Sequence, residues 1–370
     1  MRVPYVDLPA QSVEVHGALH RAFDRVLRRG DFVLGEAVEA FEAAFARSCQ
    51  APYAVGVNSG TDALWLSLAA LGIGPGDEVI TTAYTFFATA SAIALTGASP
   101  VAADIDPVTY TLDPASVEAA VTKRTKAILA VHLFGQPADM DRLTRIARRH
   151  RLALVEDCAQ AHGAAFRGQS VGTFGEAGAF SFYPTKNLSA LGDAGLIVTT
   201  RRALRDRLRL LRDHGQTRPY RHAALGHNSR LDTLQAAVLL AKLPRLAAWN
   251  RRRAQHARRY TARLGACAAR IVLPHAAPHR THVYHVYAVQ VPGRDRVVRG
   301  LRARGIQALV HYPSLFYEQP VFRRLGCRRG RCPVAERLAR RAVSLPIAPQ
   351  LQPAQIDYVA EQLINIVGGR

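Results

Sequence analysis

The chain has 370 residues, 49% of them hydrophobic, which is enough apolar material for one large domain or two unequal ones. No uninterrupted apolar run approaches the length of a membrane span, so we expect no membrane association. The formal net charge of +21 would suit binding to nucleic acid or to a phosphorylated substrate. The arginines of the chain, however, are dispersed along helix-like stretches such as 201–213 and 249–264 and are not clustered with aromatic residues. This distribution does not favour nucleic-acid binding.

From residue 53 onward, short apolar runs alternate with amphipathic segments. Seven runs are typical of strands and cover 53–57, 78–82, 99–104, 126–132, 152–156, 177–182 and 195–199. Helical patterns lie between most of them, at 61–72, 85–97, 113–122 and 139–150. Buried strands that alternate with helices predict an α/β domain built on a mostly parallel sheet.

After residue 200 the pattern changes to long helices, ending with a helical run at 231–250. The remaining stretch has a strand pattern at 282–291 and helical patterns near 295–304, 334–342 and 353–367. We therefore predict a large domain over 1–250 and a smaller C-terminal α+β domain over 251–370.

The cysteines are odd in number and scattered, at positions 49, 158, 267, 327 and 332. This pattern argues against a disulfide framework and favours the reducing cytoplasm. The N-terminal residues MRVPYVDLPAQ also lack the basic and apolar regions of a signal peptide. Cys327 and Cys332 have no second pair to complete a zinc site, so we expect no metal.

Two residues are candidates for chemistry at strand ends. Asp157 follows the apolar run LALVE, at the carboxyl end of a strand, which is where ligands bind in open α/β sheets. A carboxylate there can keep a ring nitrogen protonated and make a pyridinium an electron sink, although a strand-end Asp also commonly caps the next turn. Lys186 leaves another strand for a glycine-rich loop, where burial would make it an amine nucleophile. Because the chain otherwise uses arginine for positive charge, an ordinary exposed lysine is the weaker interpretation.

Two further segments add to this pattern. NSGTDAL follows the strand at 53–57 and opens a helix, so the backbone amides of Gly60 and Thr61 could bind a phosphate, although SGTD is also a plain helix cap. Phe86 lies just past the strand at 78–82 and could stack on a flat ring, although a core position is the commoner role. The order of these features along the chain is more informative than any one of them.

Taken together, these motifs resemble the DegT/DnrJ/EryC1/StrS family of sugar aminotransferases, within the fold-type I enzymes that use pyridoxal phosphate (PLP). The resemblance extends nearly from end to end. It covers FVLGEAVEAFEAAFA, NSGTDAL, VHLFGQPADMD, VEDCAQAHGA, the segment around Lys186, GHNSRLDTLQAAVLLAKL, HVYHVYAV, HYP and SLPIAP. It implies a large domain with a mostly parallel sheet, a homodimer with shared active sites, and transfer of an amino group from glutamate or glutamine to a keto sugar.

The resemblance also implies roles for individual residues. Lys186 would hold PLP as a Schiff base and then move the proton between cofactor and substrate, and Asp157 would pair with the pyridine nitrogen. The remaining cofactor contacts would be Gln160 near the ring hydroxyl, Phe86 over the ring, Gly60, Thr61 and Ser181 at the phosphate, and Asn228 at the phosphate of the neighbouring subunit. Candidates for the substrate site are Arg230, His311, Tyr312 and Tyr317.

Some relatives in the family are not transaminases. The sugar 3-dehydratases replace the lysine with histidine, and one branch adds a cysteine-bound iron–sulfur cluster. This chain has Lys186 and no cysteine cluster, and both features favour transamination.

The substrate is less clearly indicated. VHLFGQPADMD and NSRLDTLQAAVLLAKL are more similar to the branch that aminates C3 of nucleotide-linked 3-keto-6-deoxyhexoses than to the C4 branch, and we expect a dTDP-linked sugar. After HYP the chain reads SLFYEQ, which departs from the usual Pro and His of the family, so we expect Phe316 and Tyr317 to reshape the sugar pocket. A keto-inositol substrate and a non-catalytic regulatory or nucleic-acid-binding role remain alternatives, although a non-catalytic scaffold has no chemical need of Asp157 and Lys186.

Overall fold

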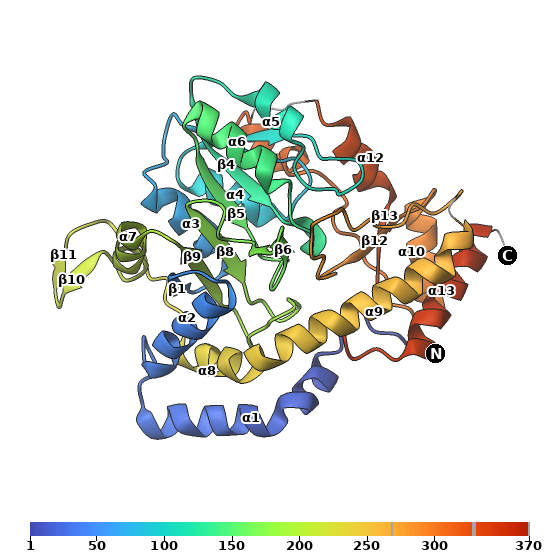
Figure 1. The fold of residues 1–370 in the computed structure, drawn as a ribbon, viewed down its shortest axis with the longest axis horizontal. Coiled ribbons are helices and arrows are strands. Elements are labelled where there is room, and N and C mark those ends of the chain that lie inside the picture. The colour runs from blue at the N-terminus through green and yellow to red at the C-terminus, as the bar shows by residue number, and fades with distance from the viewer. Residues whose placement is uncertain (268, 328–330, 369–370) are drawn as a thin grey trace.

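The computed structural model describes residues 1–267, 269–327 and 331–368. Its main part is a seven-stranded sheet between layers of helices (Figure 1). The strand order is β1-β9-β8-β5-β4-β2-β3. The bounds are β1 Tyr53–Val57, β2 Glu78–Thr82, β3 Ser99–Ala103, β4 Thr125–Val131, β5 Ala153–Asp157, β8 Ala177–Ser181 and β9 Gly195–Thr199. Only β9 runs against the others, so the predicted mostly parallel α/β sheet is confirmed.

Both faces of this sheet are buried, which explains the near-continuous apolar runs of its strands. On one face, side chains such as Val55 and Leu129 pack under α3 (Gly60–Ala70), α4 (Phe87–Leu95) and α7 (Arg202–Arg212). The alternate side chains face four other helices. These are α2 (Glu36–Ser48), α5 (Pro114–Ala120), α6 (Met140–His150) and α8 (Thr233–Lys242). The fold is therefore a helix–sheet–helix sandwich.

The predicted helical run at 231–250 is interrupted in the structure. A 3-10 turn at Leu243–Arg245 separates α8 from α9, which spans Leu246–Leu264. Pro244 lies in this turn, and proline lacks the amide hydrogen that a continuous helix needs. The long first helix, α1 (Leu8–Arg29), lies along α8 (Figure 1).

The C-terminal part has its own hydrophobic core around a two-stranded antiparallel sheet. Its elements are β12 (Tyr287–Gln290), α10 (Arg294–Ala303), α11 (Pro320–Arg324), α12 (Pro333–Arg341), β13 (Ala342–Leu345) and α13 (Pro353–Gly368). The strand predicted at 282–291 is shorter than expected, because residues 282–286 leave it as a loop beside the main sheet.

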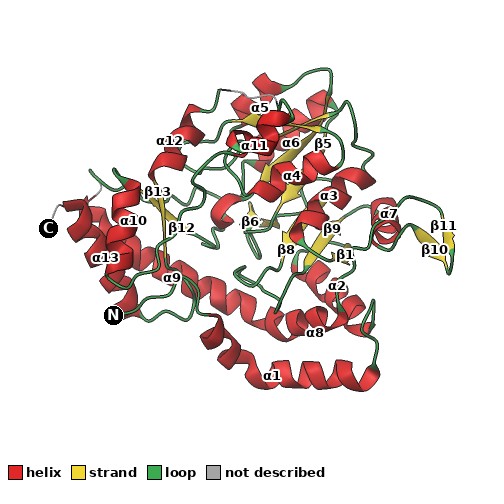
Figure 2. Cartoon of the chain, turned by 180° about the vertical axis from the view of Figure 1, so that it is seen from behind, coloured by secondary structure: helices red, strands yellow, loops and turns green. Residues whose placement is uncertain are grey.

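The two parts are joined by α9, which passes through residue 250 without interruption (Figure 2). Val3 pairs with Ile306 and packs in the C-terminal core, although it lies in the range predicted for the large domain. A division at residue 250 would therefore cut a helix, and the two-domain boundary stays a prediction.

Small peripheral elements complete the chain. They are the hairpin β6 (Ala165–Phe166) and β7 (Gln169–Ser170), the hairpin β10 (Gln216–Arg218) and β11 (Arg221–His222), and three short 3-10 turns at 133–135, 265–267 and 316–318. The β10–β11 hairpin projects away from the body of the molecule beside α7 (Figure 1).

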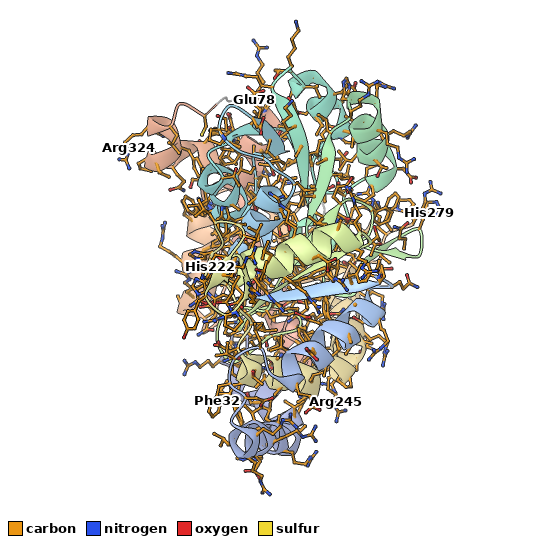
Figure 3. The ribbon with its side chains drawn as sticks, turned by 90° about the vertical axis from the view of Figure 1, so that its left-hand side faces the viewer. Phe32, Glu78, His222, Arg245, His279 and Arg324 are labelled. Carbon is orange, nitrogen blue, oxygen red and sulfur yellow. The ribbon has the colours of Figure 1, made fainter. Side chains whose placement is uncertain are left out.

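The excess of arginine is spread over the surface. Figure 3 shows Arg245 and Arg324 at widely separated places on the periphery. Many other arginines form ion pairs with nearby carboxylates, such as Arg259 and Arg263 with Asp357. No helix in the described ranges is both long and apolar enough to cross a membrane.

Candidate active site

The carboxyl ends of β1, β2, β5 and β8 lie at one edge of the sheet, because these strands run in the same direction. Each strand is followed at this edge by one of the segments selected from the sequence. The segments are the start of α3, the turn that contains Phe86, Asp157 and the loop that contains Lys186. Tertiary structure thus brings together residues that are more than 120 positions apart.

Asp157 ends β5 with its side chain 6% exposed. The Thr89 hydroxyl donates to its Oδ2 at 2.8 Å, and the Ala159 amide donates to its Oδ1 at 3.1 Å. Burial raises the pKa of Asp157, while these two hydrogen bonds and the Lys186 ammonium lower it. The carboxylate is oriented by neutral donors and would be stabilised by a cationic partner.

Lys186 lies in a tight turn after β8, where its amide donates to the Tyr183 carbonyl at 2.8 Å. Burial lowers the pKa of its amine from 10.5 to about 8, against the opposing effect of Asp157. The next residue, Asn187, donates to Asn250 Oδ1 at 2.9 Å and to the Val283 carbonyl at 3.0 Å. The loop is therefore anchored to α9 and to the segment before β12, which holds the lysine at the sheet edge.

The start of α3 approaches the ends of two strands very closely. A Cβ atom on Gly60 would lie 2.5 Å from the Ser181 Cβ, and one on Gly195 would lie 2.2 Å from the Ser59 carbonyl oxygen. The amides of Gly60 and Thr61 precede the first hydrogen bond within the helix and remain available for an anion. The Ser59 hydroxyl caps the helix by accepting from the Asp62 amide at 3.1 Å. This glycine-lined approach fits a phosphate group.

Aromatic and amide side chains line the space near Asp157. Phe86 is 54% exposed, and its ring centroid lies 5.8 Å from that of Tyr312. Gln160 Nε2 donates to the Tyr312 hydroxyl at 3.0 Å, while its Oε1 accepts from the Phe134 amide at 2.6 Å. Burial, together with the charge of Asp157, raises the pKa of Tyr312. An exposed phenyl ring beside a hydrogen-bonding side chain can hold a flat polar ring.

His311 precedes Tyr312 at the same place. Its Nδ1 lies 2.9 Å from the Ser344 hydroxyl, and burial with the charge of Lys186 lowers the pKa of His311 to about 4. The buried Tyr84 hydroxyl accepts from the Tyr312 amide at 2.6 Å and donates to the His311 carbonyl. The imidazole is thus neutral near pH 7 and is held beside the lysine.

A family model, described as the DegT/DnrJ/EryC1/StrS aminotransferase family, matches residues 15–364. This chain belongs to that family. It is therefore a PLP-dependent aminotransferase, and the resemblance seen in the sequence is confirmed. The buried Asp157 carboxylate, the reactive amine of Lys186 and the glycine-lined phosphate cradle fit PLP.

Individual relatives match over almost their whole length. A protein named pleiotropic regulatory protein, from Geobacillus stearothermophilus, is 47% identical over 98% of both chains. A dTDP-3-amino-3,4,6-trideoxy-alpha-D-glucose transaminase from Streptomyces venezuelae is 46% identical over 97% of this chain and 96% of the relative. The crystal structure of S. venezuelae DesV in complex with a ketimine intermediate superimposes with a TM-score of 0.94 at 46% identity, covering 98% of this chain and 97% of that chain.

Within this aminotransferase, three of the proposed residues lie apart from Lys186 and Asp157. Tyr317 is buried with Phe316 in a hydrophobic cluster, and its hydroxyl donates to Glu336 at 3.2 Å. Asn228 lies in an exposed segment that bridges to Asp213, and Arg230 pairs with Asp213 at 3.2 Å. Neither Asn228 nor Arg230 contacts Asp157 or Lys186 of its own chain.

Sequence reasoning missed several residues that orient the site. Thr89 and Tyr84 hold Asp157 and the backbone of Tyr312, and His285 Nδ1 lies 3.2 Å from Asn187 Oδ1. A threonine one helical turn after Thr85 carries no signal in a single sequence. Asn187 could have been found, because it follows the candidate lysine directly.

A buried group of potential metal ligands lies behind Asp157, formed by His132, Glu156 and Cys158. His132 Nδ1 accepts from the Ala138 amide at 3.0 Å, so the proton on Nε2 faces Glu156 at 3.0 Å. Glu156 also accepts three backbone amides, from residues 172, 174 and 175. The ligand atoms of His132 and Glu156 are already committed to hydrogen bonds, and Glu156 supports the loop that precedes β8.

Proposed function

We propose that this aminotransferase moves an amino group from glutamate or glutamine to the C3 keto group of a nucleotide-linked sugar, with a dTDP-3-keto-6-deoxyhexose as the preferred acceptor. The observation that carries the proposal is the placement of Lys186 beside Asp157 at the carboxyl edge of the sheet. The names of the relatives support the acceptor, because several of them describe transaminases of dTDP-linked 3-amino sugars.

In this proposal each residue has one task. When bound, PLP supplies an electron sink that stabilises negative charge on the substrate carbon. The neutral amine of Lys186 accepts and returns the proton at that carbon, and Asp157 keeps the cofactor nitrogen protonated. Gly60, Thr61 and Ser181 bind the phosphate.

Gln160 orients the cofactor's ring hydroxyl and Phe86 covers the ring. His311 and Tyr312 lie on the side of Phe86 and would contact the sugar. Because Tyr317 is packed in a hydrophobic cluster, we do not give it a substrate contact. The sequence neighbours Phe316 and Leu315 are buried as well. The unusual SLFYEQ segment therefore affects the packing that holds His311 and Tyr312 in place more than it affects the residues that line the site.

The acceptor is tested by measuring amination of paired keto sugars with glutamate as donor. We expect the dTDP-3-keto sugar to be aminated with a kcat/KM at least about 100-fold above that of its 4-keto isomer, a difference of about 2.7 kcal/mol in transition-state binding. A preference for the 4-keto isomer would contradict the proposed position of amination. A uridine-linked 3-keto sugar is the third substrate to compare, because two relatives act on such sugars by name.

A regulatory role is the alternative suggested by the name of one relative. The residues of this chain do not favour it, because a buried carboxylate and a buried lysine amine whose pKa is lowered to about 8 occur together at the strand ends, as a catalytic site requires. We place the reaction in the cytoplasm, since the cysteines are odd in number and scattered along the chain.

We also propose a homodimer with shared active sites. Tyr220 is 97% exposed and Leu225 is 100% exposed, and both lie in the projecting segment that leads to Asn228. Large apolar side chains that are fully exposed on a projecting segment are typical of a surface that a second subunit covers. Asn228 would then reach the phosphate of the neighbouring site.

Mixed dimers test this arrangement. Asn228→Ala alone should weaken PLP retention by about 10-fold, the effect of one hydrogen bond to a charged group. Mixed with Lys186→Ala, it should recover up to about a quarter of the wild-type activity, because random association into dimers creates one complete site in half of them. No recovery beyond that of either variant alone would show that Asn228 acts within its own chain.

A further inference from the structure

Ser229 is a fully buried serine that connects two segments far apart in the sequence. Its hydroxyl donates to Asp62 Oδ2 at 2.6 Å and accepts from the Asn58 amide at 3.3 Å. Its own amide donates to the Arg212 carbonyl at 2.9 Å, at the end of α7. The hydroxyl therefore contacts both ends of the turn between β1 and α3, which is the turn that forms the glycine-lined phosphate cradle.

The start of α3 has the sequence of a capping box, but only half of the box is formed. In a capping box the side chain of the first residue accepts from the amide of the fourth, and the side chain of the fourth accepts from the amide of the first. In SGTD, the Ser59 hydroxyl accepts from the Asp62 amide at 3.1 Å. The Asp62 carboxylate does not return this bond in the described chain, because it accepts from Ser229 instead.

A free Asp62 carboxylate would compete with the phosphate of the cofactor. The amides of Gly60 and Thr61 have no partner within the helix, and the amides at the start of a helix attract any nearby anion. Asp62 is half-buried in this first turn, so its carboxylate would be within reach of these amides if nothing held it. The Ser229 hydroxyl is the side-chain group that holds it in the described part of the chain.

We propose that Ser229 is a positioning residue that keeps the Asp62 carboxylate away from the amides that bind the cofactor phosphate. The inference rests on the proposed phosphate cradle and adds the residue that keeps this cradle open. Ser229 acts through Asp62 and not by touching the phosphate. A serine hydroxyl has a single proton, and the proton of Ser229 is already donated to Asp62.

The test compares PLP with pyridoxal, which has the same ring and aldehyde but no phosphate. Both are titrated into the apoprotein, and the absorbance of the lysine-bound ring is followed. We expect Ser229→Ala to weaken the affinity for PLP by about 10-fold or more, the effect of one hydrogen bond to a charged group, and to change the affinity for pyridoxal by less than about 2-fold. A general loss of structure would weaken the binding of both compounds.

Ser67→Ala is the matched control. Ser67 lies in the same helix and is fully buried, but its hydroxyl donates to the Ala63 carbonyl at 2.6 Å and not to a carboxylate. This variant should bind PLP as the wild type does. Unchanged PLP affinity in Ser229→Ala, or equal weakening of PLP and pyridoxal, overturns the proposal.

Removal of Asp62 separates competition from loss of support. Asp62→Ala should bind PLP at least as tightly as the wild type, because the competing carboxylate is gone. Adding Asp62→Ala to Ser229→Ala should restore the PLP affinity to within about 3-fold of the wild type, a non-additive result that only competition explains. A double variant that binds PLP as weakly as Ser229→Ala overturns the proposal. If Ser229→Ala is unstable by thermal unfolding, Asp62→Ala decides alone, and a 10-fold loss of PLP affinity in it, about the effect of one lost supporting bond, contradicts the proposal.

The wild-type protein tests the cradle itself. We expect PLP to bind at least about 100-fold more tightly than pyridoxal, because the phosphate adds charge-assisted hydrogen bonds. Equal affinities for the two compounds would refute the phosphate cradle. A large preference for PLP that persists in Ser229→Ala would leave the cradle in place and refute only the role of Ser229.

Discussion

Lys186→Ala should lower turnover by at least about 10⁴-fold, because it removes both the covalent attachment of the cofactor and the base that moves the proton. The chain still has Asp157 and the glycine-lined cradle at Gly60, so the variant should keep PLP non-covalently. Its spectrum should lack the absorbance band at about 410–420 nm that lysine-bound cofactor gives. Borohydride followed by peptide mapping should label Lys186 in the wild type only. Lys126→Ala, at an exposed position, is the control with an unchanged spectrum.

The pH dependence of PLP uptake by the apoprotein checks the same residue. Burial lowers the pKa of Lys186 to about 8, so the reactive neutral amine is populated above about pH 8 instead of above the usual 10.5. The uptake rate should therefore rise with pH and reach half its maximum near pH 8. A rate that keeps rising to pH 10, or a label on another lysine, would contradict the assignment of Lys186.

Asp157→Asn should lower turnover by about 10²- to 10³-fold while the protein stays folded. The amide is nearly the same size and can keep hydrogen bonds to Thr89 and the Ala159 amide. It cannot carry the negative charge that holds the cofactor nitrogen protonated, so the electron sink is weakened. The loss of turnover should appear in kcat for both half-reactions, since both depend on the pyridine ring of the same cofactor. PLP affinity should fall as well.

Two variants support this experiment. Thr89→Val removes only the hydroxyl that orients Asp157 Oδ2, so turnover should fall by about 10-fold. Asp141→Asn, which changes an exposed aspartate paired with Arg167, should leave turnover unchanged. If Asp157→Asn affected only thermal stability and not kcat, the carboxylate would be structural and our assignment would be wrong.

Much of the fold could be predicted because its signals are local. Each strand of the sheet is a short apolar run, since both faces are covered, and the flanking helices have periodic apolar positions such as Leu143 and Ile146. The error at 231–250 came from treating an apolar periodicity as continuous across Pro244. The strand at 282–291 was overestimated because an apolar alternation can also belong to a buried loop.

The site was predictable where a residue's role depends on its position at a strand end. Asp157 and Lys186 could be selected in this way, and the family match then supplied what a single residue could not. The side of the chain on which Tyr317 would pack could not be predicted. Tyr312, five residues earlier, contacts Gln160, whereas Tyr317 packs in a hydrophobic cluster. The two tyrosines have the same side chain, and only the path of the backbone between them gives them different surroundings.

By itself, the sequence determined the α/β class, the order of the strands along the chain and the identity of the lysine and aspartate, because these depend on local periodicity and residue chemistry. Only the tertiary structure decided which neighbours surround them. Thr89 beneath Asp157, Asn250 against Asn187 and Ser229 against Asp62 all arise from contacts between distant segments. Burial and electrostatics depend on every group packed nearby, so the lowered pKa of Lys186 could be obtained only from the folded chain.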